Sequence, residues 1–139
     1  MKVLKIEICS LRNRRLEYAY DVRVDRASVL GNRFVMRSEV ERNTVCDLYK
    51  EYFDNMVLQT KGMFMDGSPD LAKITKFADA ATLKRFSDEL NTLIYKALKF
   101  DKLRLFCWCA PKRCHAETIA LYVANELADF FDKCVIEYI

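Results

Sequence analysis

Residues 102–115 read Lys-Leu-Arg-Leu-Phe-Cys-Trp-Cys-Ala-Pro-Lys-Arg-Cys-His, and this stretch decides the fold class. Its apolar first half predicts a buried strand at Lys102–Cys109, which Pro111 ends. The residues that follow predict a helix at about Arg113–Phe131, because apolar side chains recur at helical spacing. These side chains are Ile119, Val123, Leu127 and Phe130. A strand that leads directly into a helix is the repeating unit of α/β folds.

Two alternating segments near the N-terminus, Val3–Ile8 and Glu17–Val24, also predict strands, and the chain closes with a predicted strand at Val135–Tyr138. Helices separate the early strands from Lys102–Cys109, so these strands are expected to pair in parallel. The sequence therefore predicts one α/β domain over residues 1–139. Its sheet is expected to be small, mostly parallel and Rossmann-like, with helices flanking it.

The predicted helices lie in the middle of the chain. A capping box at Ser38–Glu41 opens the first, and Lys61–Pro69 breaks it. A short helical piece is expected at Asp70–Phe77, and a strongly amphipathic helix runs over about Ala80–Leu98. In the first helix an aromatic stripe, which includes Tyr49, is expected to face the core.

The composition limits the class of protein. Of 139 residues, 52% are hydrophobic, which is enough for a core, and the 23 basic and 20 acidic residues give a net charge of +3. This near balance argues against a protein that coats nucleic acid and leaves a local basic site open. No segment has the pattern of a signal peptide or of a membrane span. We expect a cytoplasmic protein with no membrane partner, whose cysteines are reduced thiols or metal ligands.

A second informative stretch, Arg23–Arg37, is predicted to be a basic loop around a Gly31-Asn32 turn. Both turn residues tolerate a positive φ, so the turn can direct backbone N–H groups at an anion. Arginine suits bidentate binding of phosphate or carboxylate. Strand alternation places Arg23 and Asp25 on one face, where they can pair. The alternative is a solvated loop with an internal Asp–Arg ion pair.

The segment Cys107–His115 holds three of the six cysteines and the only histidine in nine residues. It lies at the join of the predicted strand and helix, where open α/β folds place their ligands. Cys107 and Cys109 share a strand face, while Cys114 and His115 are expected in the first turn of the helix. There the free N–H groups and the helix dipole lower a thiol pKa and attract anions.

Four interpretations of this segment stay open. The first is a zinc site with Cys107, Cys109, Cys114 and His115 as ligands, although adjacent Cys114 and His115 side chains diverge on a helix. The second is catalysis, with His115 as general base and Cys109 or Cys114 as nucleophile. The third is a pocket in which His115 forms hydrogen bonds and Trp108 or a tyrosine stacks on the ligand. The fourth is structural, with buried thiols that pack the strand against the helix.

The two motifs occur together in a known family pattern. Arg23–Phe34 reads Arg-Val-Asp-Arg-x-Ser-x-Leu-Gly-Asn-x-Phe, and Cys107–His115 reads Cys-x-Cys-x-Pro-x-x-Cys-His. Over about Tyr20–Leu127 the chain resembles DUF4326, small phage and bacterial proteins of unknown function. The resemblance implies one site built from both motifs. The chain departs from the pattern at Arg33, where the family commonly has proline, and at Ala116-Glu117, where it often has Gly-Asp.

The residue patterns and the resemblance lead to one expected site at the carboxyl edge of the sheet. Its expected ligand-binding residues are Arg23, Asp25, Arg26, Gly31, Asn32, Arg37, Trp108 and Glu117. Glu117 is alternatively a first-turn carboxylate that the helix dipole favours. Such a site suits a phosphorylated small molecule, a nucleotide or nucleotide sugar, and is compatible with transferase or hydrolase activity in nucleic-acid metabolism. Two alternatives are a non-catalytic module that captures this ligand and a zinc-supported module that binds nucleic acid or protein.

Overall fold

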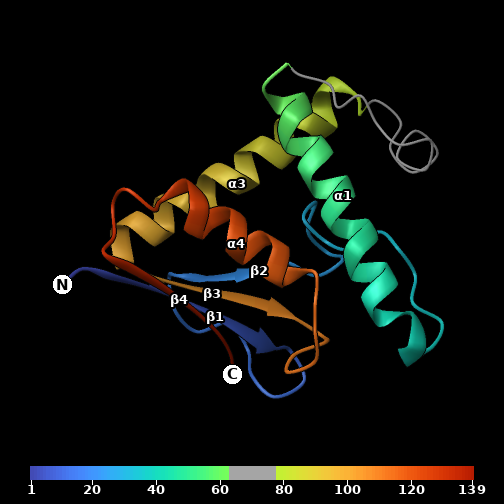
Figure 1. Ribbon diagram of the computed structural model, residues 1–139, viewed down its shortest axis with the longest axis horizontal. Helices are drawn as coiled ribbons and strands as arrows, with labels where there is room; N and C mark the ends of the chain where they lie inside the picture. Colours follow the sequence, from blue (N-terminus) through green and yellow to red (C-terminus); the bar gives the residue numbers. More distant parts are fainter. Residues whose placement is uncertain (63–77) are drawn as a thin grey trace.

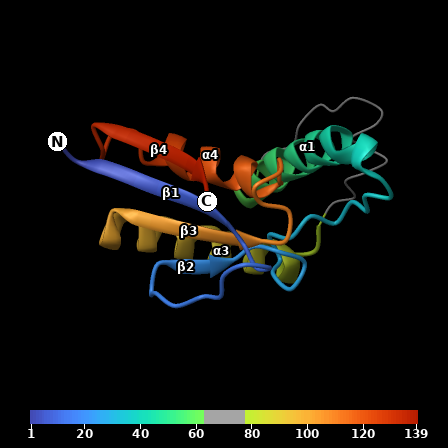
Figure 2. The ribbon, with the colours of Figure 1, turned by 90° about the horizontal axis from the view of Figure 1, so that it is seen from below.

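The computed structural model describes residues 1–62 and 78–139 as a sheet of four strands with helices against it (Figures 1 and 2). The strands are β1 (Val3–Ser10), β2 (Asp21–Arg23), β3 (Lys102–Cys107) and β4 (Lys133–Tyr138). Their order in the sheet is β2-β3-β1-β4, and every neighbouring pair is parallel. The expected α/β class with a parallel sheet is confirmed.

The helices are α1 (Arg42–Thr60), α3 (Ala80–Phe100) and α4 (Ala116–Glu126), and a 3-10 turn, η1 (Glu39–Glu41), precedes α1. The connections β2 to β3 and β3 to β4 both step across the sheet in the same direction. Right-handed crossovers in one direction place their helices on one face. Figures 1 and 2 accordingly show α3 and α4 on the same side of the sheet, with α1 packed near the carboxyl ends of the strands.

Alternation along the central strands separates a core face from a polar face. The core face presents Leu4, Ile6 and Ile8 of β1 and Leu103 and Leu105 of β3, all fully buried under the helices. On the other face Glu7 pairs with Lys102 at 2.8 Å, and the guanidinium of Arg104 lies over the Phe106 ring. Tyr18, in the connection between β1 and β2, lies against this second face, where the Arg104 guanidinium is 5.4 Å from the centre of its ring.

The strand predicted at Glu17–Val24 is wrong in its first half, since β2 begins only at Asp21. One carboxylate oxygen of Asp21 accepts hydrogen bonds from the backbone N–H groups of Glu17 and Tyr18, at 2.8 and 2.9 Å. A side chain that binds its own upstream backbone favours a turn over a strand.

The predicted capping box is also wrong. Ser38 makes no side-chain hydrogen bond to the first turn, and α1 begins four residues later, at Arg42. Glu39 is instead bound by Arg42, whose Nε and Nη2 donate to both carboxylate oxygens at 2.8 Å. The helix ends at Thr60, directly before the expected break at Lys61, which confirms the start of that break. The short helix expected at Asp70–Phe77 lies outside the described residues.

The elements around the Cys107–His115 segment are shorter than expected. Strand β3 ends at Cys107, two residues early, and α4 runs only from Ala116 to Glu126. Cys114 and His115 therefore precede the helix instead of lying in its first turn. The closing strand is confirmed as β4, one edge of the sheet. Within residues 1–62 and 78–139, none of the helices combines the length and apolar character needed to cross a bilayer.

Candidate functional site

The two sequence motifs meet because β2 and β3 are parallel neighbours. Arg23 of β2 is in register with Phe106 of β3, and Val24 N–H donates to the Phe106 carbonyl at 3.0 Å. The chain after each strand therefore leaves the sheet at the same edge, which Figure 2 shows. Leu11 N–H donates to the Cys107 carbonyl at 2.8 Å, so the connection after β1 starts there too. Open parallel sheets bind their ligands at this edge.

Asp25 joins the two motifs. Arg23 donates Nε and Nη2 to its two carboxylate oxygens at 2.7 and 2.8 Å, which confirms the pairing expected from alternation. Trp108 donates its indole Nε1–H to one of these oxygens at 2.8 Å, from 83 residues away in the chain. The hydrogen bond from Arg23, followed by that from Trp108, lowers the pKa of the buried Asp25 carboxyl against the effect of burial. Asp25 is thus an ionised carboxylate that links the loop to the segment.

The loop around Gly31 closes on its own backbone. Arg26 donates to the carbonyls of Asn32 and Phe34 at 3.0 and 3.2 Å. A Cβ atom at Gly31 would lie 2.4 Å from the Asp25 carbonyl oxygen, so close approach requires the glycine. Neither Gly31 nor Asn32 adopts the positive φ that both tolerate, since Asp101 and Gly62 are the residues with that conformation in the described part of the chain.

Cys114 is the centre of a cluster of thiols. Its Sγ lies 2.9 Å from Cys107 Sγ and 3.3 Å from His115 Nδ1. The expectation that the Cys114 and His115 side chains diverge is wrong, because both residues precede α4. The other ring nitrogen of His115, Nε2, faces the Val24 carbonyl, which can only accept, so Nε2 carries the proton. Burial lowers the pKa of His115, which favours the neutral imidazole and leaves its unprotonated Nδ1 beside Cys114 Sγ.

Cys109 has the most strongly lowered pKa of this cluster. A hydrogen bond with Cys114 and a second with the Arg42 guanidinium lower its pKa to about 5, although partial burial acts in the opposite direction. The hydrogen bonds of Cys114 with Cys107 and with Cys109 raise the pKa of Cys114 itself. These opposite shifts favour Cys109 as the thiolate and Cys114 as the protonated thiol. A half-buried thiolate beside a guanidinium has the surroundings of a nucleophilic cysteine.

The thiols are not spaced as zinc ligands. Two thiolates on a tetrahedral zinc, each with a Zn–S bond of about 2.3 Å, lie about 3.8 Å apart. Cys107 and Cys114 are closer than this, at 2.9 Å. In the part of the chain that the structure describes, no group of three or more His, Cys, Asp or Glu side chains is arranged to hold a metal ion.

A cavity of about 390 Å³ opens between the loop, α1 and the segment, within the size range of small-molecule sites. The loop lines it with Asp25, Arg26, Asn32, Phe34 and Met36. The segment contributes Cys107, Trp108, Cys109, Arg113, Cys114 and His115. Helix α1 adds Arg42, Val45 and Cys46, which the sequence pattern did not reveal because nothing in a helical repeat marks which turn borders a cavity.

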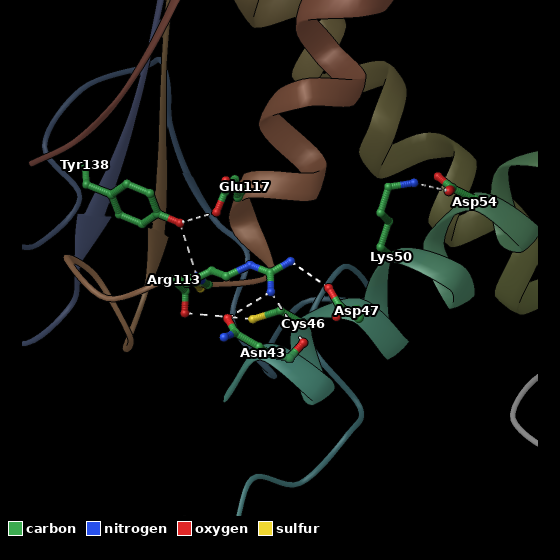
Figure 3. Close-up of polar contacts among 9 residues, drawn as sticks. Asn43, Cys46, Asp47, Lys50, Asp54, Arg113, Glu117 and Tyr138 are labelled. Atoms are coloured by element: carbon green, nitrogen blue, oxygen red, sulfur yellow. Dashed lines mark hydrogen bonds and ion pairs between the residues drawn. The ribbon is translucent and has the colours of Figure 1, made fainter. Parts of the chain in front are cut away.

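Three of the expected ligand-binding residues lie elsewhere. Arg23 is outside the cavity wall, and its side chain binds Asp25. Arg37 is exposed and does not line the cavity. Glu117 accepts a hydrogen bond from the Tyr138 hydroxyl at 2.9 Å, and that hydroxyl in turn accepts from Cys114 N–H at 3.2 Å (Figure 3). Glu117 therefore positions the segment.

Arg113 fixes the other side of the segment to α1. Its guanidinium donates to Asp47 at 2.8 Å and to the Asn43 side chain at 3.0 Å (Figure 3). Its carbonyl accepts a hydrogen bond from Arg42 at 3.0 Å. The cavity wall is thus tied to both the helix and β4.

A second hollow, of about 440 Å³, adjoins the cavity. The two share Arg26 and Asn32, and Gly31 lines only the second. Arg33 also lines it, with its guanidinium 5.2 Å from the centre of the Tyr52 ring. The site is therefore a cavity with a polar extension on the side of the loop.

Comparison with known families supports the grouping of both motifs. A family model described as a domain of unknown function, DUF4326, matches residues 9–125. The chain belongs to the DUF4326 family. The matched region contains Asp25, Trp108 and the thiol cluster, so the whole of the cavity wall lies within the family domain. No curated protein and no solved structure matches the chain.

Proposed function

We propose that this DUF4326 protein binds a phosphorylated small molecule, a nucleotide or a nucleotide sugar, in the cavity between the loop and the segment. The observation that carries the proposal is that the positive charge of Arg26 is not paired with a described carboxylate. Arg26 lines the cavity, and its hydrogen bonds go to two carbonyls, so no carboxylate neutralises it among the described residues. An unneutralised guanidinium in a concave site favours an anion.

The remaining cavity wall suits the organic part of such a ligand. Trp108 is 47% exposed at the cavity and presents an aromatic surface on which a base can stack. Phe34, Met36 and Val45 add apolar surface, and Asn32 offers an amide that can donate or accept hydrogen bonds. Apolar walls with a few polar groups are typical of nucleotide-sized sites.

Trp108 also provides the test, because it is the only tryptophan in the chain. Titration with nucleoside monophosphates, diphosphates and a nucleotide sugar is expected to change its fluorescence to saturation. The matching nucleosides, which lack phosphate, should bind at least about tenfold more weakly, since a charge-assisted hydrogen bond contributes about 1.5–3 kcal/mol. Equal binding of nucleosides and nucleotides, or no response to the whole panel, would contradict the proposal.

Arg26→Gln is expected to weaken nucleotide binding about tenfold or more. Because Arg26 also holds the loop, Arg26→Lys is needed beside it, and this variant should retain part of the affinity by keeping the charge. Arg85→Gln is the matched control, since it removes an exposed arginine from α3. Thermal unfolding of each variant separates lost binding from lost folding.

A second candidate function is group transfer through Cys109, which the lowered pKa and its position on the cavity wall favour. With a nucleotide sugar bound, the thiolate would attack the anomeric carbon, and the nucleoside diphosphate would leave with the electron pair. A water or acceptor hydroxyl would then displace the sulfur. Cys109→Ser should abolish turnover and keep the Trp108 response, whereas turnover that survives this change would exclude the candidate.

A further inference from the structure

We propose that the carboxyl edge of the sheet binds a single-stranded nucleic acid, with one nucleotide of the strand in the cavity and its neighbours on the basic loops around it. This inference rests on the proposed function, since the ligand in the cavity remains a nucleotide. It adds the polymer to which that nucleotide belongs.

Arginines are concentrated at this edge. Of the 11 arginines in the chain, nine lie in or directly beside the connections that leave β1, β2 and β3. They are Arg12, Arg14, Arg15, Arg23, Arg26, Arg33, Arg37, Arg42 and Arg113. Among the described lysines, Lys112 alone lies in these connections. Arginine binds phosphate through two parallel N–H donors, whereas lysine is a hydrated point charge. The predominance of arginine over lysine at this edge therefore favours phosphate recognition.

The basic residues extend beyond what one ligand in the cavity can reach. On one flank, the backbone N–H groups of Arg12 and Arg14 bind Ser10 at the end of β1, and both side chains are exposed. Arg12 is close enough to help lower the pKa of Cys109. On the other flank Arg33 lines the second hollow. A cavity of about 390 Å³ holds one nucleotide, so flanking phosphates are needed to use both sides.

The flanking arginines are also those that carry free charge. Arg23, Arg42 and Arg113 are paired with Asp25, Glu39 and Asp47. By contrast, no ion pair with a described carboxylate involves Arg12, Arg14 or Arg33. Unpaired positive charge beside the cavity suits the phosphates that flank one nucleotide of a strand.

The aromatic residues point to a single strand. Trp108 is half-exposed at the cavity, where a base can stack on it. A base inside a duplex cannot enter a cavity, because it must first leave its stack. A single strand avoids that cost, so it should bind more tightly than the duplex of the same sequence.

The test is fluorescence anisotropy with labelled DNA and RNA strands of about 12 nucleotides and mixed sequence. Each is titrated with the full chain at salt concentrations from about 50 to 200 mM, and competed with mononucleotides, the duplex and polyglutamate. Either strand is expected to bind at least about tenfold more tightly than any mononucleotide. The logarithm of the binding constant should fall with that of salt by about 0.7 for each phosphate contacted.

Arg12→Ala/Arg14→Ala should reduce this salt slope by about 1.4, which corresponds to two phosphates, and leave the Trp108 response to mononucleotides unchanged. Lys84→Ala/Arg85→Ala removes the same charge from exposed positions on α3 and should leave the slope as it is.

Three outcomes would overturn the inference: strands that bind no better than mononucleotides, equal competition by duplex or polyglutamate, or equal losses in the two double variants. If mononucleotides still change Trp108 fluorescence, the inference alone has failed. If they do not, the proposed function has failed with it.

Discussion

The Arg23–Arg37 loop and the Cys107–His115 segment meet at one edge of the sheet, but they use their polar groups in opposite ways. The loop binds some of its own polar groups: Arg23 binds Asp25, and Arg26 binds two loop carbonyls. The segment leaves a thiol, Cys109, with a lowered pKa at the cavity. Part of a motif dense in charge can thus hold the shape of a loop, while the group with the lowered pKa is a small side chain opposite it.

The stability of the protein is expected to be sensitive to changes in the shape of the loop. Gly31→Ala places a Cβ atom 2.4 Å from the Asp25 carbonyl oxygen and 2.6 Å from Arg26 Cα. Because both contacts are with backbone, no side-chain rotation relieves them, and the free energy of unfolding should fall by about 3 kcal/mol. Urea denaturation measures this loss.

Gly62→Ala is the matched control. Gly62 has a φ of 72°, and a Cβ atom at this position would meet nothing within 4 Å, so the cost there is conformational, about 1 kcal/mol. If the two variants lost equal stability, the close approach at Gly31 would not be what holds the loop.

Removing the charge of Asp25 should have the next largest effect on the free energy of unfolding. Asp25→Asn breaks the bidentate ion pair with Arg23 and is expected to cost about 2 kcal/mol. Asp47→Asn, at the exposed pair with Arg113, should cost less than about 1 kcal/mol. Comparison of the two unfolding free energies checks the difference between a buried and an exposed carboxylate.

The same pair gives a pH dependence. Since the pKa of Asp25 is lowered in the folded protein, its contribution is complete above the ordinary value of 3.8 and is lost as the pH falls through the lowered pKa. Stability of the native sequence should therefore drop more steeply below pH 3.8 than that of Asp25→Asn. Parallel curves would show that Asp25 is not tied to Arg23 in solution.

A smaller effect is expected where α1 meets the loop. The buried Tyr49 hydroxyl donates to the Leu30 carbonyl at 2.6 Å. Tyr49→Phe leaves that carbonyl without its donor and should cost about 1 kcal/mol, measured by thermal unfolding. Tyr95→Phe, at an exposed position of α3, should change nothing measurable. Equal effects would mean that the hydrogen bond does not join loop and helix.

The segment is predicted to respond in reactivity and not in stability. Iodoacetamide should alkylate Cys109 at a nearly constant rate from pH 9 down to about 6.5, because its thiolate predominates above pH 5. Cys46, on the same cavity with a pKa raised by burial, is the internal comparison and should slow at each step toward lower pH. Peptide mapping by mass spectrometry separates the two sites.

Two variants sharpen this prediction. Cys114→Ala removes the main cause of the low Cys109 pKa, and Arg42→Gln removes the next, so both should move the rate profile to higher pH, the first by more. An alkylation-rate profile for Cys109 with its midpoint at about pH 8.5 in the native sequence would contradict the lowered pKa of this thiol.

Periodicity predicted a buried strand at Lys102–Cys109, which the structure shows over Lys102–Cys107, and the apolar faces of α1 and α3, because these depend on neighbours within a few residues. The helices between the strands predicted their parallel pairing. Periodicity failed at element ends. Asp21 converts the start of an alternating segment into a turn, and Ser38 does not form the side-chain hydrogen bond of a capping box. Arg42 binds the neighbouring Glu39 and fixes the chain before α1. At such positions a side chain competes for backbone or charge, and pattern alone does not show which contact forms.

The sequence by itself determined the class of the fold and the two motifs of the site, since both are written in local spacing and residue type. The contacts that each motif makes follow only from the tertiary structure. Which arginines are neutralised, and why Cys109 and Cys114 have opposite pKa shifts, depends on distances across the fold. The hydrogen bond from Trp108 to Asp25 is 2.8 Å long, although the two residues are 83 positions apart in the chain. Electrostatic interactions depend on the distance in space and not on the separation along the chain.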